Sequence, residues 1–176
     1  VLLQSSLSAG MFAGKGYLKQ TKVLPLALFA MLGALVGSIL SIALPQQIFS
    51  YAMGASLLIM LFFLFSSPKR FKEDNLEKLY GKRGLVHYLV FFLIGIYGGF
   101  VQVGTGFFLM AAGTIMLGCN IIRTNAIKSF VMTLYTIVAI FVFMQHGSIN
   151  WQYGLLHSVG TLVGSYIATR LAFKKG

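Results

Sequence analysis

The chain of 176 residues is 57% hydrophobic and only 10% charged, with a mean hydropathy of +0.84. Soluble domains carry about 25% charged residues, so this composition excludes an ordinary soluble protein and indicates a polytopic membrane protein. The formal net charge of +11 would suggest nucleic acid on a soluble chain. Here the basic residues lie between apolar runs, where they mark topology and face anionic lipid, so no nucleic-acid partner is expected.

Few residues are suited to redox, metal or proton chemistry. Cys119 is the single cysteine, and the three acids, Glu73, Asp74 and Glu77, share one polar loop. These facts exclude an internal disulfide and disfavour a metal site or a carboxylate proton relay within the spans. A membrane-embedded enzyme needs a His, Asp, Ser or Cys constellation at membrane depth, which is absent. We therefore expect no enzyme activity and no cofactor.

The apolar runs predict a series of helical spans. The run 107–118 is short, at about 18 Å as a helix against a hydrocarbon core of about 30 Å. Pro25 and Pro45 bound the first full span, and the following span is expected to form a hairpin with it. In chain order the expected pieces are 1–18 (the latter part of a span), 24–44, 48–66, 85–104, 107–118, 127–145 and 153–173.

Lysine and arginine clusters set the orientation. They precede residue 24, fill the segment 67–83, surround the start of the 127–145 span and end the last span. Cytoplasmic basic clusters require the chain to leave at Arg83 and to return by Arg123. The short 107–118 piece must therefore carry it back, so 85–104 and 107–118 form a there-and-back pair with a glycine-rich break between them.

An internal repeat accompanies this topology. "GALVGS" at 33–38 recurs as "GTLVGS" at 160–165, and the two copies would run in opposite directions. The alternative explanation is that the match arises by chance in low-complexity apolar sequence. If real, it predicts an all-α polytopic membrane protein with inverted-topology helical repeats and a Gly-rich broken helix pair, a plan used by secondary transporters. We divide the chain into 1–66 (remainder of a first repeat plus an extra span), 67–84 (a cytoplasmic basic loop) and 85–176 (a second repeat, incomplete at its C-terminus).

The stretch "GIYGGFVQVGTGFFLMAAGTIMLGCNIIRTNAIKSF" resembles the second-repeat signature of the sulfite exporter TauE/SafE family, and "LLQSSLSAGMFAGKGYL" is similar to its first-repeat helix. The chain departs from the family pattern at residues 104–108, where the usual Gly-x-Gly-Gly-Gly reads Gly-Thr-Gly-Phe-Phe, and at 110–112, where a proline is often found. A first Gly-rich break and a final span are not present, so we expect the chain to be truncated at both ends. The resemblance implies transport of sulfur-containing or small carboxylate anions.

The candidate binding residues fall around the break. Unwound backbone at membrane depth is tolerated where it lines a cavity, and its N–H groups suit an anion. We predict that the glycines let the backbone unwind, beside two neutral hydrogen-bonding side chains. The same glycines would also serve close helix packing alone. The candidates are Gly98, Gly99, Gln102, Gly104, Thr105 and Gly106.

A second group of candidate binding residues lies at the start of the next span. Lys128 lies one helical turn after Thr124, so both can face one side, with Asn125 beside them. Gln4 and Ser5 occupy the corresponding place in the other repeat copy. Lys128 would alternatively snorkel to the interface as a topology signal.

Together these features predict a membrane transporter, an exporter by its resemblance, for a small anion such as sulfite or another sulfur-containing or organic anion. The alternative is a non-transporting membrane scaffold or accessory subunit. The expected partners are the anion and the lipid bilayer of a prokaryotic cell membrane, and homo-oligomerisation is left open.

Overall fold

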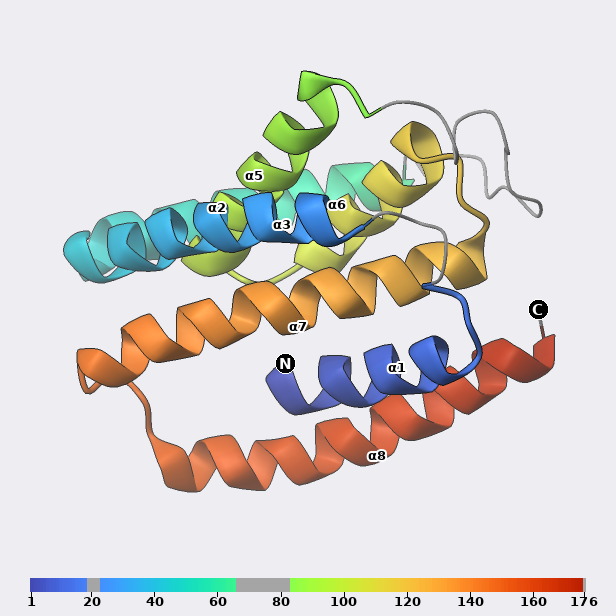
Figure 1. Ribbon diagram of the computed structural model, residues 1–176. Coiled ribbons are helices and arrows are strands. Elements are labelled where there is room, and N and C mark those ends of the chain that lie inside the picture. The colour runs from blue at the N-terminus through green and yellow to red at the C-terminus, as the bar shows by residue number, and fades with distance from the viewer. Residues whose placement is uncertain (19–22, 66–82, 176) are drawn as a thin grey trace.

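The computed structural model describes residues 1–18, 23–65 and 83–175, and the regular structure in these ranges is entirely helical (Figure 1). The predicted loop 67–84 lies outside the described residues except for its last two. A π-helical turn, η1, continues α6. The elements are α1 (Leu2–Gly14), α2 (Leu24–Ala43), α3 (Gln46–Phe65), α5 (Leu85–Phe100), α6 (Thr105–Ala111), η1 (Ala112–Met116), α7 (Ile121–Gln145) and α8 (Trp151–Lys175).

Local sequence explains where the helices begin and end. Pro25 lies in the first turn of α2, where its missing N–H costs no hydrogen bond. Leu44 ends the helix in an extended conformation, which a following proline favours. α7 begins at Ile121 rather than at the predicted Ile127. The reason is Asn120, whose side-chain oxygen accepts a hydrogen bond from the Arg123 backbone N–H at 2.8 Å and caps the helix.

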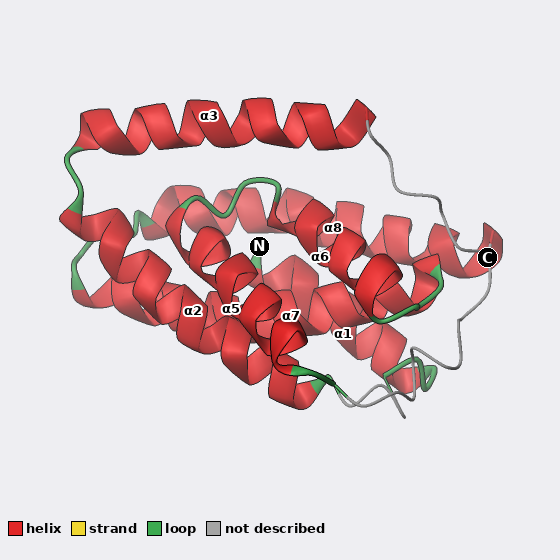
Figure 2. Ribbon diagram, turned by 90° about the horizontal axis from the view of Figure 1, so that it is seen from above, coloured by secondary structure: helices red, strands yellow, loops and turns green. Residues whose placement is uncertain are grey.

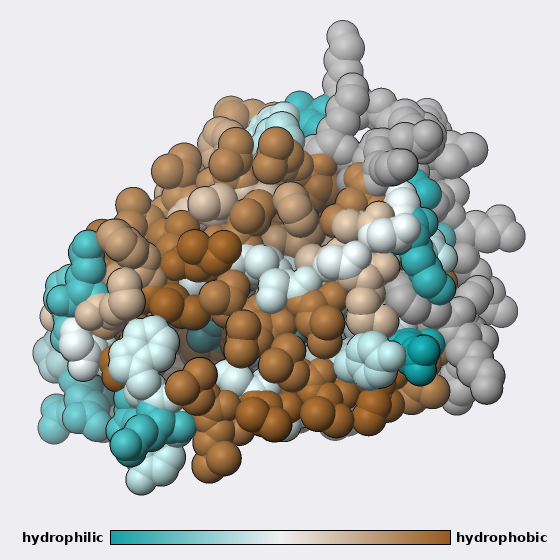
Figure 3. Space-filling model, turned by 60° about the horizontal axis from the view of Figure 1, so that its bottom comes forward, coloured by the Kyte–Doolittle hydropathy of each residue, from teal (hydrophilic) through white to brown (hydrophobic). Residues whose placement is uncertain are grey.

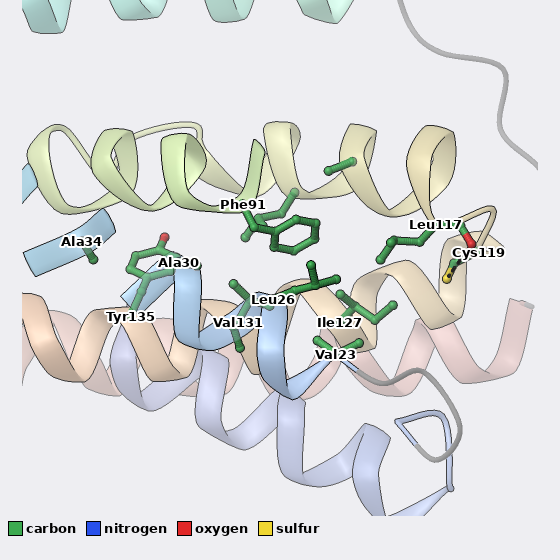
Figure 4. Close-up of a cluster of buried hydrophobic side chains, with 13 residues drawn as sticks. Val23, Leu26, Ala30, Ala34, Phe91, Leu117, Cys119, Ile127, Val131 and Tyr135 are labelled. Atoms are coloured by element: carbon green, nitrogen blue, oxygen red, sulfur yellow. Dashed lines mark hydrogen bonds between the residues drawn. The ribbon is translucent and has the colours of Figure 1, made fainter. Parts of the chain in front are cut away.

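The core lies where α2, α5, α6 and α7 meet (Figure 4). Its members are mostly small or branched apolar side chains, joined by one buried tyrosine and the cysteine. They are Val23, Leu26, Ala27, Ala30, Ala34, Phe91, Leu109, Ala112, Leu117, Cys119, Ile127, Val131 and Tyr135.

Glycines bring α2 and α5 into backbone contact. A Cβ built on Gly33 would lie 2.8 Å from the Ile96 backbone nitrogen, and one on Gly99 would lie 2.8 Å from the Ala34 Cα. Real Cβ atoms do not approach backbone so closely, so these positions admit only glycine. Helix pairs in membranes use small residues in this way, because close backbone approach maximises van der Waals contact. The glycines of "GALVGS" on α2 therefore serve close helix packing.

The helix directions agree with the inverted repeat. α1 runs opposite to α7, and α2 opposite to α8 (Figure 1). α2 begins at Leu24 and α8 at Trp151, which is the same offset of 127 that separates "GALVGS" from "GTLVGS". The starts of α2 and α7 and the end of α8 lie at one end of the bundle. The α2–α3 and α7–α8 turns, without Lys or Arg, lie at the other.

The outer surface is strongly apolar. Large hydrophobic side chains are exposed along α2, α3 and α8, including Leu58 at 69% and Leu156 at 75%. On the face shown in Figure 3 they form a broad band with hydrophilic residues at both ends. By length and composition, α2 and α7 can each cross a bilayer, while α5 and the α6–η1 segment are shorter apolar helices. α3 stands apart from the other helices over most of its length (Figure 2).

Candidate functional site

The predicted break between the paired helices is present. α5 ends at Phe100, and α6 begins at Thr105 as a separate helix. Two residues of the connection have left-handed backbones, Gln102 with φ 65° and Gly104 with φ 77°. This conformation suits glycine but strains glutamine. The Thr105 hydroxyl donates to the Gln102 carbonyl at 2.9 Å, and the Tyr97 hydroxyl donates to the Val103 carbonyl at 2.6 Å. These bonds hold the connection in place.

The unwound region is shorter than predicted. Gly98 and Gly99 are helical residues of α5, so the prediction that they unwind is wrong. Gly99 packs on the α2 backbone, and a Cβ on Gly98 would lie 3.0 Å from the Tyr135 ring and 3.1 Å from the Thr105 methyl group. Their function in this structure is to allow close packing. Gly106 is also helical, in the first turn of α6.

A polar cavity of about 450 Å³ opens among α1, α6, α7 and α8, and we call it the lysine cavity. Its size is within the range of small-molecule sites. Of the predicted residues it contains Gln4, Ser5, Gly106, Asn125 and Lys128. The remaining lining residues, which sequence reasoning missed, are Ser8, Phe12, Ser129, Met132, Gly164, Ser165, Ala168, Thr169 and Ala172.

Three hydroxyls in the cavity form a chain whose direction can be worked out. Ser165 donates to the Gln4 carbonyl at 2.9 Å. A hydroxyl has one proton, so the 2.8 Å contact between Ser8 and Ser165 must be donated by Ser8. The 2.9 Å contact between Ser8 and Thr169 must then be donated by Thr169. All three protons are used in joining α1 to α8, and none remains for a ligand.

Other donors in the lysine cavity remain available. The Lys128 ammonium, the Gln4 side-chain amide and the Ser129 hydroxyl make no hydrogen bond within the described ranges. Asn125 uses one amide proton on the Ile121 carbonyl at 3.2 Å, which leaves the second. Ser5 is satisfied by backbone carbonyls of its own helix. The cavity thus combines one cation with neutral donors on α1 and α7.

No carboxylate compensates Lys128 in the described part of the chain. All three acidic residues lie at positions 73–77, within the undescribed segment 66–82. Lys128 lies in α7, about 10 Å from its first residue at 1.5 Å per residue, and is only partly exposed. Burying an ammonium group is costly unless an anion or strong acceptor pairs with it. A bound anion would supply that partner.

Gln102 belongs to a different cavity, which we call the turn cavity. This larger hollow, of about 1050 Å³, lies at the end of the bundle that carries the α2–α3 and α7–α8 turns. Its polar lining is neutral and comes from Ser41, Gln46, Gln102, Ser148 and Asn150. The structure therefore separates Gln102 from Lys128, whereas the sequence predicted one shared site.

The other predicted residues line neither the lysine cavity nor, apart from Gly99, the turn cavity. Thr105 is fully buried against Tyr135 and Gly98. Thr124 is also buried, with its hydroxyl donating to the Cys119 carbonyl at 3.2 Å. Thr124 therefore does not line the lysine cavity with Lys128, although the two lie one turn apart on α7, because Thr124 packs on Gly113 of η1. Gly104 lies in the turn between α5 and α6, where its left-handed backbone, with φ 77°, suits glycine.

Comparison with known proteins agrees with these features. The model of the family described as "Sulfite exporter TauE/SafE" matches residues 1–176. A "Probable membrane transporter protein ORF9" of Sinorhizobium sp is 26% identical over 166 residues, covering 94% of this chain and 62% of that protein. A "Probable membrane transporter protein" of Haemophilus influenzae is 27% identical over 155 residues, covering 85% and 58%. The "Probable membrane transporter protein YfcA" of Escherichia coli K12 is 29% identical over 123 residues, covering 67% and 43%. No solved structure matches the chain significantly.

The apolar exterior and the broken helix pair indicate a helical membrane protein, and the relatives that it resembles are named as membrane transporters. More specifically, the chain belongs to the sulfite exporter TauE/SafE family. It spans about 60% of the length of the first two of these relatives.

Proposed function

We propose that the protein moves a small anion across the bilayer and that the anion binds in the lysine cavity. The observation that carries this proposal is the position of Lys128, a cation lining a polar cavity with no acidic residue in the described part of the chain. The Ser129 hydroxyl and the Gln4 and Asn125 amides would donate hydrogen bonds around the anion. Charge-assisted hydrogen bonds of this kind are about twice as strong as neutral ones.

The substrate class that we favour is sulfite or another small sulfur-containing or organic anion. Such ions present several acceptor oxygens and no donor that the cavity would leave unpaired. Support comes from the family description and from the relatives that are named as membrane transporters. Those relatives are bacterial, so we place the protein in a bacterial plasma membrane, and the family description suggests export as the direction.

The test is anion flux in liposomes containing the intact protein, with radiolabelled sulfite and acetate as probes. We expect Lys128→Gln to lower flux of the transported anion by about tenfold or more, the size expected from losing one charged hydrogen bond. Lys128→Arg should retain part of the activity because it keeps the charge. Lys15→Gln is the matched control, since it removes an equal charge from the end of α1, outside the lysine cavity.

Two outcomes would contradict the proposal. Flux of neither probe by the well-folded wild-type protein would favour the accessory or scaffold alternative. Flux that is equal in wild type and Lys128→Gln would show that the anion binds elsewhere. Size-exclusion chromatography in detergent separates these results from misfolding.

A further inference from the structure

A buried layer of side chains separates the two cavities. Along α7, the lysine cavity ends at Met132 and the turn cavity begins at Ile140, a gap of about 12 Å at 1.5 Å per residue. Within this gap Tyr135 and Thr136 are almost completely buried, at 0% and 2% exposure. At the helix break the same order recurs: Gln102 lines the turn cavity, Thr105 is fully buried, and Gly106 lines the lysine cavity.

Thr136 of this layer lies on the α7 face that both cavities share. Asn125 and Phe143 are 18 residues apart, which is five turns of 3.6 residues, so both point the same way. Thr136 is 11 residues after Asn125 and lies about 20° from the same direction. In Figure 4, Tyr135 rises from α7 with its hydroxyl oxygen directed toward α5 and α6. Thr136 thus lies between the two cavities along α7, and the Tyr135 ring lies beside it toward the α5–α6 break.

Neither the Thr136 hydroxyl nor the Tyr135 hydroxyl makes a hydrogen bond of good geometry in the described structure. The Tyr135 hydroxyl lies near the Thr105 side chain, whose own proton is donated to the Gln102 carbonyl. Thr136 does not use even the carbonyl one turn earlier, as Thr133 does with Ser129 at 2.8 Å. A buried hydroxyl without a well-formed hydrogen bond is destabilising, because it has lost its bonds to water and gained none in return. Two such groups side by side, between two polar cavities, indicate a position that a passing polar ligand satisfies.

We propose that the two cavities are the ends of one substrate path, and that Tyr135 and Thr136 close its middle and donate hydrogen bonds to the anion as it crosses. This inference rests on the proposed function, because it assigns the crossing point to the same anion that binds beside Lys128. Thr105, packed against Tyr135 across the break, positions the tyrosine ring. Opening the path requires the α5–α6 connection to move away from α7.

The first experiment replaces the hydroxyls without changing shape, using Tyr135→Phe and Thr136→Val in the intact protein. Since these hydroxyls are unsatisfied, their loss should leave the melting temperature unchanged or higher, while sulfite or acetate flux falls by about tenfold. A purely structural role would not give this combination of intact stability and lost flux. Thr133→Val and Tyr153→Phe are the controls, because the Thr133 hydroxyl is satisfied outside the layer and Tyr153 is exposed.

The second experiment tests the layer without using flux. Single cysteines replace Met132 and Ile140 in a background whose other cysteines are removed, Cys119 by alanine. A membrane-impermeant thiol reagent should label Met132→Cys from the side of the basic clusters only, and Ile140→Cys from the opposite side only. Labelling of both positions from one side would overturn the inference.

The two proposals fail separately. Unchanged flux in Tyr135→Phe and Thr136→Val, together with lost flux in Lys128→Gln, would overturn the crossing point and leave the proposed function intact. Absence of anion flux in the wild type would overturn the proposed function. The sided labelling would in that case still decide whether the layer divides two cavities.

Discussion

Lys128 of α7 lies directly against Gly106 of α6: its Cδ is 3.5 Å from the position that a Cβ on Gly106 would occupy. This is ordinary van der Waals distance, so a methyl group fits there but a larger side chain does not. The glycine keeps the lysine stem free to lie across the start of α6. The contact joins two residues that the sequence placed at one site.

Gly106→Ala should therefore preserve anion flux, whereas Gly106→Val should lower it about tenfold by displacing Lys128 into the cavity. Valine adds two γ-carbons beyond a Cβ that already lies 3.5 Å from the Lys128 Cδ and 4.0 Å from the Met132 sulfur. Flux in liposomes is the measurement. Equal flux in the alanine and valine variants would show that the lysine stem does not need this space.

The sequence predicted a break within residues 98–106, and the structure has it between Phe100 and Thr105. It could not assign Gly98 and Gly99, because glycine density is equally expected for unwinding and for close packing. Only the contacts in the folded protein distinguish the two roles, and here Gly99 packs on Ala34 and Gly98 on Tyr135. The start of α7 was missed for a similar reason. Polar residues at its beginning lower the local hydropathy, while the Asn120 cap extends the helix over them.

The sequence grouped some of the residues that line the lysine cavity, and it missed others. The repeat offset brought Gln4 and Ser5 toward Asn125 and Lys128, and the structure places all four in the lysine cavity. The same reasoning failed for Gln102, because sequence adjacency to Gly106 does not reveal that the break turns the two residues toward different cavities. The α8 hydroxyls were missed since small residues at helical spacing usually indicate packing. Their actual partner, Ser8, lies more than 150 residues away.

Packing of α2 on α5 gives a stability prediction. Gly37→Ala should destabilise the intact protein by about 1–3 kcal/mol, the usual range for overpacking, because the new Cβ would lie 3.0 Å or less from the Ile96 backbone. Gly54→Ala on α3 meets nothing within 4 Å and should have little effect. Thermal unfolding in detergent compares the two. A Gly37→Ala protein as stable as its control would show that α2 and α5 can separate without cost.

The hydroxyl chain between α1 and α8 gives a second stability prediction. Ser8→Ala removes its middle member, leaving the Thr169 proton without an acceptor, and should cost about 1–2 kcal/mol. Anion affinity should be unchanged, because no proton of this chain is free to reach a ligand. Ser6→Ala is the control, since the Ser6 hydroxyl bonds only within its own helix. Weaker anion binding in Ser8→Ala, without loss of stability, would mean that Ser8 donates to the substrate instead.

Gln102 has a left-handed backbone, so substitutions at this residue can distinguish backbone strain from a function in transport. Gln102→Gly should raise stability by about 1 kcal/mol, because glycine adopts φ 65° without the clash that a Cβ brings. Gln102→Ala keeps the Cβ and should give no such gain. Both variants remove the amide from the turn cavity, so any function of that amide in transport would appear as an equal loss of flux in the two proteins. Measuring unfolding and flux together distinguishes these effects. A Gln102→Gly protein no more stable than Gln102→Ala would show that the connection relaxes around glutamine and stores no strain.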